Sequence, residues 1–203
     1  MSTQEQDEND LIQKAQKGDL EALAQVFETN RERLKRMIRV RMSERVRPRV
    51  AASDVLQEAY VDLAQQLGNY AKDPKLPFFL WMRRVTGLRL AKVHREHLGQ
   101  KIRDVNRERR LDVAIPDASA VYMANQLSGH FTSVSEKAMR SENELRMQAA
   151  IEQVSETDRE ILAMRHVEQL TNSEIAVLLE ISESAATNRY VRAIRKLKDA
   201  MGE

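Results

Sequence analysis

The residues best suited to bind a ligand lie in the last basic segment, "ESAATNRYVRAIRKL" (residues 183–197). Wound as a helix, the segment has an apolar face made of Ala186, Tyr190, Ala193, Ile194 and Leu197. The opposite face carries Ser184, Thr187, Asn188, Val191, Arg192 and Arg195. Asparagine and arginine bind base edges, hydroxyls suit phosphate, and valine can touch a thymine methyl. Because a membrane-surface helix would expose bulky apolar residues instead, this pattern favours duplex DNA.

Two histidines raise a different chemistry, that of a metal site. His94 and His97 are three residues apart and can share a helix face. However, Glu96 between them faces elsewhere, His130 and His166 lie in unrelated contexts, and the chain has no cysteine. Nucleophile and phosphate-loop signatures are absent as well. We therefore expect no metal, no cofactor and no catalytic residue.

The charges are nearly balanced, with 33 Lys and Arg against 31 Asp and Glu, but they are segregated along the chain. Basic residues gather in three runs, at 31–49, 83–110 and 189–198. Separate basic surfaces are typical of proteins that bind a long polyanion, because each contact releases counterions. The alternative is that each run is an ordinary solvated helix face.

The spacing of the apolar residues predicts an all-α fold. In the first half, a break near Pro48 precedes a helix that Ser53 or Asp54 caps and Gly68 ends. The segment "GNYAKDPKLP" then reads as a loop, because it combines Gly, Asn and two prolines. A strongly apolar helix that contains Trp81 follows.

We expect two small helical domains, residues 1–98 and 135–203, joined by a charged extension and flexible linker at 99–134. Residues 114–134 mix Pro, Asp, Ser and Gly with isolated apolar side chains that could dock locally. In the second domain, "SVSE" and "TNSE" are capping boxes, and Ser155 with Asp158 caps another helix. A short helix, a tight turn at 180–182 and a longer basic helix complete a helix-turn-helix. An ordinary helical hairpin is the alternative.

Three segments resemble the bacterial sigma-70-type RNA polymerase sigma factors, in particular the extracytoplasmic-function group. "EQVSETDREILAMRHVEQLTNSEIAVLLEISESAATNRYVRAIRKL" is similar to region four of that family. "ASDVLQEAYVDLAQQL" with "PFFLWMRRVTGLRLAKVHREHL" is similar to region two, and "LIQKAQKGDLEALAQVFE" to the family's start. Together these segments cover most of residues 10–98 and 135–200.

The resemblance implies an initiation factor that lends promoter specificity to core RNA polymerase and catalyses no reaction. The "DVLQEA" helix would dock on polymerase through Asp54, Gln57 and Glu58. The second domain would hold the minus-35 duplex, through Arg189 as well as the polar face given above. A sequestering anti-sigma protein or another regulator is also implied.

The resemblance further implies that the loop before the Trp81 helix captures a base flipped out of the minus-10 element. That loop contains Asn69 and Tyr70, and Tyr70 either stacks on the base, for about 1–3 kcal/mol, or closes the small core. The expected phosphate-tracking residues behind it are Arg83, Arg84, Arg89, Lys92 and Arg95. Three positions depart from the family's usual residues: Leu88 stands where Asn is common, Glu180 where Gly is usual, and Ser155 where Pro is common.

A helix-turn-helix regulator that binds DNA without polymerase is the main alternative. Such a protein would need a sensor domain, and residues 1–132 lack the alternating strands of a receiver. The start "MSTQEQDEND" is polar and acidic, unlike a signal peptide, and no apolar run approaches the ~20 residues of a membrane span. We therefore expect a cytoplasmic protein that does not contact a membrane.

Overall fold

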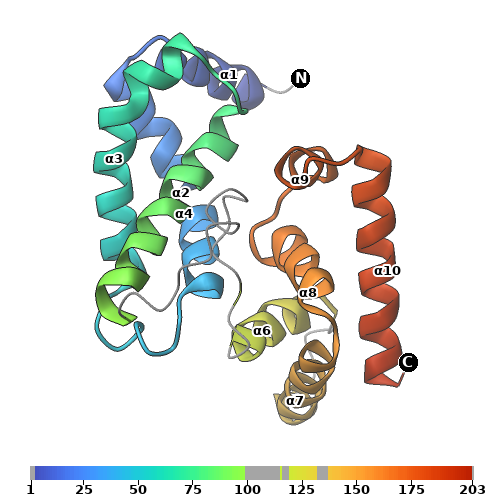
Figure 1. Ribbon diagram of the computed structural model, residues 1–203. Helices are drawn as coiled ribbons and strands as arrows, with labels where there is room; N and C mark the ends of the chain where they lie inside the picture. Colours follow the sequence, from blue (N-terminus) through green and yellow to red (C-terminus); the bar gives the residue numbers. More distant parts are fainter. Residues whose placement is uncertain (1–2, 99–114, 116–118, 132–136, 203) are drawn as a thin grey trace. The chain divides into compact units, whose positions relative to one another are not determined.

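The structure is a computed structural model that describes residues 3–98, 115, 119–131 and 137–202. Every regular element in these ranges is a helix (Figure 1), which confirms the expected all-α fold class. The expected charged extension at 99–113 and the "SVSE" box at 133–136 lie outside the described residues.

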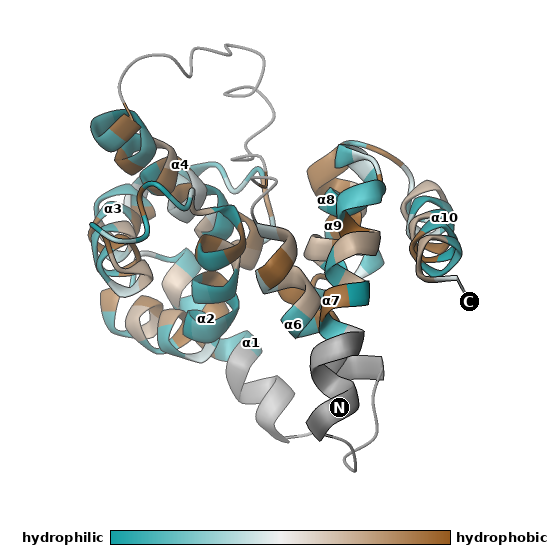
Figure 2. Cartoon of the chain, turned by 90° about the horizontal axis from the view of Figure 1, so that it is seen from below, coloured by the Kyte–Doolittle hydropathy of each residue, from teal (hydrophilic) through white to brown (hydrophobic). Residues whose placement is uncertain are grey.

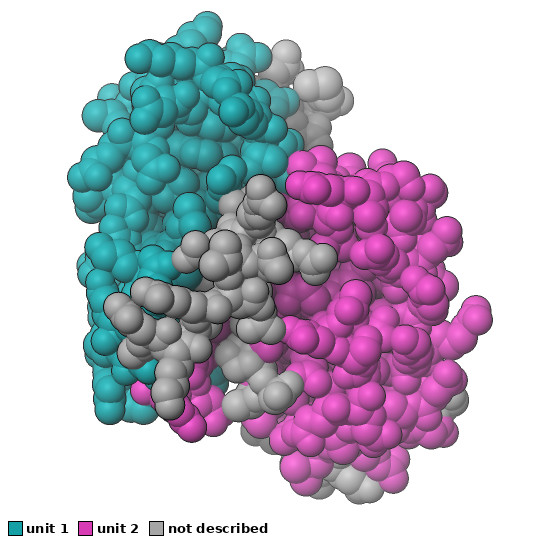
Figure 3. Space-filling view, in the orientation of Figure 1, with its two compact units in different colours: residues 1–38, 46–113 teal, residues 39–45, 114–203 magenta. Residues whose placement is uncertain are grey.

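The chain divides into two compact units, coloured separately in Figure 3. Unit 1 comprises residues 1–38 and 46–113, and unit 2 comprises residues 39–45 and 114–203. Each unit has its own set of buried aliphatic side chains. The domain limits at residues 98 and 135 remain a prediction.

The described part of unit 1 contains α1 (Thr3–Gln16), most of α2 (Leu20–Arg41), α3 (Ala52–Lys72) and α4 (Phe78–Leu98). The side chain of Asp19 accepts hydrogen bonds from the N–H groups of Glu21 and Ala22, at 2.9 and 3.1 Å, and so caps α2. The rings of Phe27 and Tyr60, with centroids 5.0 Å apart, join α2 to α3. The core between α3 and α4 combines leucine, valine and methionine side chains with the aromatic rings of Tyr70, Phe78 and Trp81.

Helix α3 differs from the expectation at both ends. It begins at Ala52, with Ala51 as the N-cap residue, and Asp54 contributes by accepting a hydrogen bond from the Ala51 N–H at 3.3 Å. At the other end α3 continues through Gly68 to Lys72, so the prediction that Gly68 ends it is wrong. The reason is tertiary packing: the last turn of α3 carries Tyr70 into the core, and this burial outweighs the poor helix propensity of glycine.

Residues 120–131 correct the expected linker, because they form helix α6 (Ala120–Phe131), which packs against α7 (Lys137–Gln153). Ala120, Met123, Ala124 and Leu127 are buried with spacings of three and four. The apolar pattern of this helix is short and lies among polar residues, so the sequence did not predict it. Such a short helix is stabilised mainly by packing of its buried stripe, here against α7.

The remaining helices of unit 2 are α8 (Glu156–Leu162), the π-helical turn η2 (Ala163–Val167), α9 (Asn172–Leu179) and α10 (Glu183–Met201). Helix α10 packs against α7, α8 and α9, and its hydrophobic and hydrophilic residues lie on different sides (Figure 2). Its buried residues are Ala186, Ala193 and Leu197, so small side chains let α10 approach its neighbours closely. This packing leaves the other side of α10 to solvent.

Candidate nucleic-acid interface

Capping groups define both helices of the helix-turn-helix. The Thr171 hydroxyl accepts from the Glu174 N–H at 3.1 Å, and the Glu174 carboxylate accepts from the Thr171 N–H at 2.7 Å. Helix α9 ends at Glu180, which has a left-handed φ of 53°. Ser182 then caps α10 by accepting from the Ala185 N–H at 3.2 Å. The capping box predicted at Thr171 and the N-cap predicted at Ser182 are thus confirmed, and a turn of three residues separates the helices.

The exposed face of α10 has the composition that the spacing predicted. Its exposed residues include Ser184, Asn188, Val191, Arg192 and Arg195, while Arg189 is half-buried. Tyr190 and Ile194 are half-buried on the side of the fold, and the Tyr190 hydroxyl lies 3.1 Å from His166 Nε2. We call the exposed residues Ser184, Asn188, Val191, Arg192 and Arg195 the α10 face. It combines amide, hydroxyl, methyl and guanidinium groups on one side of one helix, which suits a nucleic-acid groove.

Thr187 differs from the rest of its predicted set, because its hydroxyl is already engaged. Asn172 Nδ2 donates to Thr187 Oγ1 at 2.9 Å, and Thr187 Oγ1 donates to the Glu183 carbonyl oxygen at 3.0 Å. No local sequence pattern predicts this contact, since residues 172 and 187 are on different helices.

Lys196 joins α10 to α8 on the side away from the turn. Its Nζ donates to Asp158 Oδ2 at 2.5 Å, and the Ser155 hydroxyl donates to the same oxygen at 2.6 Å. Burial alone would raise the pKa of Asp158, but these hydrogen bonds, with the charges of Lys196 and Arg192, hold that pKa below its ordinary 3.8. The Asp158 carboxylate therefore positions α10 against α8.

In unit 1, Tyr70 closes the core instead of standing open to a base. It is 5% exposed, its ring stacks on Trp81 with centroids 4.4 Å apart, and its hydroxyl donates to the Leu76 carbonyl oxygen at 2.7 Å. Burial also raises the pKa of Tyr70 above its ordinary 10.0. Of the two alternatives for Tyr70, the geometry therefore favours the core. Asn69 beside it is exposed.

The basic residues predicted along α4 fall into two groups. Arg83 is only 2% exposed, so its side chain does not reach the surface as a phosphate contact would require. Arg84 is half-buried, whereas Lys92 and Arg95 are exposed. The exposed Leu88 lies among these residues on the outer side of α4.

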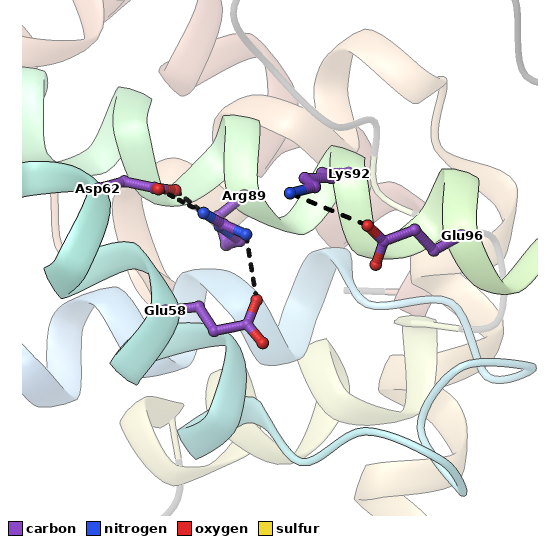
Figure 4. A network of polar contacts seen from close by, with 5 residues as sticks. All are labelled: Glu58, Asp62, Arg89, Lys92 and Glu96. Carbon is purple, nitrogen blue, oxygen red and sulfur yellow. Dashed lines mark hydrogen bonds and ion pairs between the residues drawn. The ribbon is translucent and has the colours of Figure 1, made fainter.

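Arg89 belongs to a network that spans α3 and α4. Figure 4 shows it reaching from α4 to two carboxylates of α3, while Lys92 and Glu96 pair one turn further along. Arg89 Nε donates to Asp62 Oδ2 at 2.6 Å, a second bond joins Nη2 to Asp62 Oδ1, and Nη1 lies 3.2 Å from Glu58 Oε2. The hydrogen bond with Asp62 further raises the pKa of Arg89. Arg89 is thus neutralised within unit 1, which weakens its predicted role on phosphate.

The three predicted polymerase contacts lie on one open side of α3. Asp54, Gln57 and Glu58 are all exposed, as is Val61 one turn further on. The Glu58 carboxylate is shared with Arg89, whereas Asp54 also supports the first turn of α3. Gln57 therefore has the clearest position for contact with a partner.

The histidine pair considered as a metal site is not a cluster of ligands. Within the described ranges, no three His, Asp or Glu side chains come together in a way that could hold a metal ion. His94 is 7% exposed, and burial lowers its pKa below its ordinary 6.5. In the same ranges, no helix combines the length and the apolar character needed to cross a membrane.

The capped helix pair and its exposed polar face define a DNA-binding helix-turn-helix. Comparison with protein families shows which kind of helix-turn-helix it resembles. Residues 144–197, which contain α8, α9 and nearly all of α10, match the family model for sigma-70, region 4.

Two whole-chain comparisons extend this match. The chain is 27% identical over 201 residues to the RNA polymerase sigma-H factor of Pseudomonas aeruginosa. The aligned segment covers 99% of this chain and 96% of the relative. A solved structure of CnrH in complex with the cytosolic domain of CnrY matches with a TM-score of 0.54 and 18% identity, covering 95% of each chain, and shows a shared fold. The family model and the curated relative confirm the resemblance to sigma-70-type factors, and thus to proteins of transcription initiation.

Proposed function

We propose that this protein is an initiation factor that binds core RNA polymerase and directs it to particular promoters, without catalysing a reaction. One observation carries the proposal: the α10 face is exposed in a capped helix-turn-helix that matches region four. In the proposal α10 enters the major groove of the minus-35 duplex, where Asn188, Arg192 and Arg195 reach base edges or phosphates. The whole-chain similarity to a polymerase sigma factor supports the same role.

Unit 1 would contact polymerase through α3. Its exposed side offers a carboxamide at Gln57 between the carboxylates of Asp54 and Glu58, a surface that complements basic partner side chains. Because Asp54 and Glu58 also make contacts within unit 1, Gln57→Lys is the cleaner variant. It should weaken binding to core polymerase about tenfold or more, as expected for a like charge at a complementary interface.

Gln25→Lys is the matched control, since Gln25 is an exposed glutamine on α2. Binding is measured by fluorescence anisotropy of the labelled chain titrated with core polymerase. Equal affinities for the two variants would remove α3 from the polymerase contact.

Unit 1 would also stabilise the opened minus-10 strand. The side chains open to solvent for this role are Asn69, Lys92 and Arg95, with Arg84 half-buried beside them, whereas Tyr70, Arg83 and Arg89 would maintain the fold. Permanganate footprinting of promoter complexes with Asn69→Ala tests the capture role, with Lys72→Ala at the exposed end of α3 as control. Normal melting by Asn69→Ala would count against capture.

Run-off transcription with core polymerase over a genomic promoter library tests the function as a whole. The initiation factor should produce transcripts that start at a common sequence class, and core polymerase alone should not. If the chain binds duplex DNA but yields no transcripts with core polymerase, it is a helix-turn-helix regulator that acts without polymerase contact.

A sequestering protein, or another input, would control the factor. The solved complex of CnrH with the cytosolic domain of CnrY supports an inhibitory protein partner of this kind. Insertion mutagenesis in cells that carry a reporter for the selected promoter provides the test. An insertion that raises transcription only when this factor is present would identify the regulator, and a saturating screen without one would argue against it.

A further inference from the structure

The hydroxyl of Thr187 has no hydrogen left to offer to DNA. Thr187 Oγ1 donates its single proton to the Glu183 carbonyl oxygen, four residues earlier in α10, at 3.0 Å. It must therefore accept the bond from Asn172 Nδ2, at 2.9 Å, so these two contacts also fix which end of the Asn172 amide faces α10. Thr187 is half-buried, whereas Ser184 and Asn188 on either side of it are exposed.

Asn172 makes its contact from a rigid position. It is the first residue of α9, directly after Thr171, whose N–H and hydroxyl are both engaged by Glu174. The amide therefore links a backbone fixed by a capping box to the second turn of α10. This is the part of a recognition helix that lies closest to the base edges.

The energetic balance at Asn172 indicates a role other than stability. Its Oδ1 is buried and has no hydrogen-bond partner among the described residues. An unsatisfied buried acceptor is unfavourable, and this cost offsets what the Nδ2 bond contributes. An apolar side chain at residue 172 would avoid the cost altogether, so the amide adds orientation between the helices more than stability.

We propose that Asn172 is a positioning residue for promoter recognition: its bond to Thr187 sets the rotation and depth of α10 relative to α9. The bases of the minus-35 duplex are then read by Ser184, Asn188, Val191, Arg192 and Arg195, and Thr187 supports α10 without reading a base. The inference rests on the proposed function and deepens it.

The test uses the full chain bound to core RNA polymerase, with a promoter from the run-off selection whose minus-35 positions are randomised. Binding is read by sequencing bound and free duplexes. Asn172→Leu, which keeps the branched shape of the side chain and removes the donor, and Thr187→Val, which removes the hydroxyl, should each reduce discrimination about fivefold to tenfold over several neighbouring base pairs. Because both changes break the same hydrogen bond, the double variant should lose no more sequence discrimination than either single variant.

Two further measurements separate positioning from folding. Asn172→Leu should unfold thermally within a few degrees of the wild type, and Val177→Ala, at an exposed position of α9, should leave both stability and discrimination unchanged. If Thr187→Val alters a single base position while Asn172→Leu alters none, Thr187 reads a base and the inference is wrong. An unchanged profile for both variants also overturns it. A wild-type complex without any sequence preference would instead remove the proposed function, and this inference with it.

Discussion

Helices α10 and α4 both carry basic residues that the sequence assigns to DNA, but only α10 has the expected surface. On α10 the buried residues form one stripe, Ala186, Ala193 and Leu197, and the opposite side is open. On α4 burial includes the consecutive runs 80–83 and 85–87, so it does not follow a single stripe. The difference shows that a helical wheel assigns a binding face reliably only when the helix packs on one side.

The same difference decides what an arginine does. Arg192 and Arg195 stay at the surface on a side of α10 where the residues one turn away are exposed or half-buried. Arg83 is buried within the run 80–83 of α4, and Arg89 is held by Asp62 and Glu58 from α3. A basic residue in the middle of a crowded helix is therefore a weaker sign of nucleic-acid binding than one on a one-sided helix.

The largest expected effect is on folding at Arg83. Arg83→Ala should lower the free energy of unfolding of unit 1 by about 2–4 kcal/mol, because it removes a long buried side chain and leaves a cavity. The fluorescence of Trp81, the chain's one tryptophan, follows unit 1 during urea unfolding. A loss below 0.5 kcal/mol, together with weaker promoter binding, would return Arg83 to the DNA-binding set.

Arg192→Ala, in contrast to Arg83→Ala, should weaken DNA binding and leave stability nearly unchanged. We expect promoter binding to weaken by about 1–3 kcal/mol, the typical value for an arginine at a base edge. Its unfolding should change by no more than about 0.5 kcal/mol, since Arg192 is exposed. Filter binding at two salt concentrations distinguishes base readout, which leaves the salt slope unchanged, from a phosphate contact, which reduces it.

At the α3–α4 network, Asp62→Asn should cost about 1–2 kcal/mol, since it weakens a partly buried, two-bond contact with Arg89. Trp81 fluorescence again measures the loss. Lys92→Met is the control, because the neighbouring Lys92–Glu96 pair spans 4.0 Å and both side chains are more than half exposed. If Asp62→Asn strengthens DNA binding without loss of stability, Arg89 is a phosphate contact that Asp62 restrains.

How much the sequence could predict follows from whether each signal is local. The caps at Thr171 and Ser182, the turn at Glu180 and, apart from Thr187, the exposed face of α10 depend on residues within one or two turns, and the structure has them as predicted. The fold class follows from the same local periodicity.

The features that the sequence left open or missed depend on distant partners. Tyr70 is buried because Trp81 and Phe78 meet it from α4, and α6 forms because α7 covers it. The bonds of Thr187 to Asn172 and of Arg89 to Asp62 join side chains 15 and 27 residues apart. No local pattern encodes such pairs. The residue pattern of α10 or α4 alone therefore predicts that the side chains of Thr187 and Arg89 are available to DNA, although a second helix binds each of them.

Backbone conformation offers a smaller, paired test in the two units. Glu180 has the left-handed φ of 53°, so Glu180→Gly should stabilise unit 2 by about 1 kcal/mol. Gly68 lies inside α3 with open space around its missing side chain, so Gly68→Ala should stabilise unit 1 by about 0.5–1 kcal/mol. The urea unfolding transition followed by Trp81 fluorescence should shift for Gly68→Ala alone. Circular dichroism, which follows the helices of both units, should detect the stabilisation by either change. Destabilisation by either change would show that the side chain or backbone has a contact that favours the natural residue.

The smallest expected effect depends on pH and concerns the contact of α10 with α8. Because the pKa of Asp158 is lower in the folded chain than its ordinary 3.8, the unfolded chain binds more protons in acid. The stabilisation by Asp158 is therefore fully present above pH ~5 and is lost as the pH falls below 3.8 toward the folded pKa.

Lys196→Met removes the main partner of Asp158, and half of the Lys196 side chain is exposed, so the change should cost only about 0.5–1 kcal/mol near pH 7. Measured by circular dichroism in urea, the difference in unfolding free energy between the variant and the wild type should shrink as the pH falls from 5 through 3.8 toward the folded pKa of Asp158. A difference that stays constant down to pH 3 would mean that Lys196 stabilises α10 by packing of its aliphatic stem, independently of the Asp158 charge.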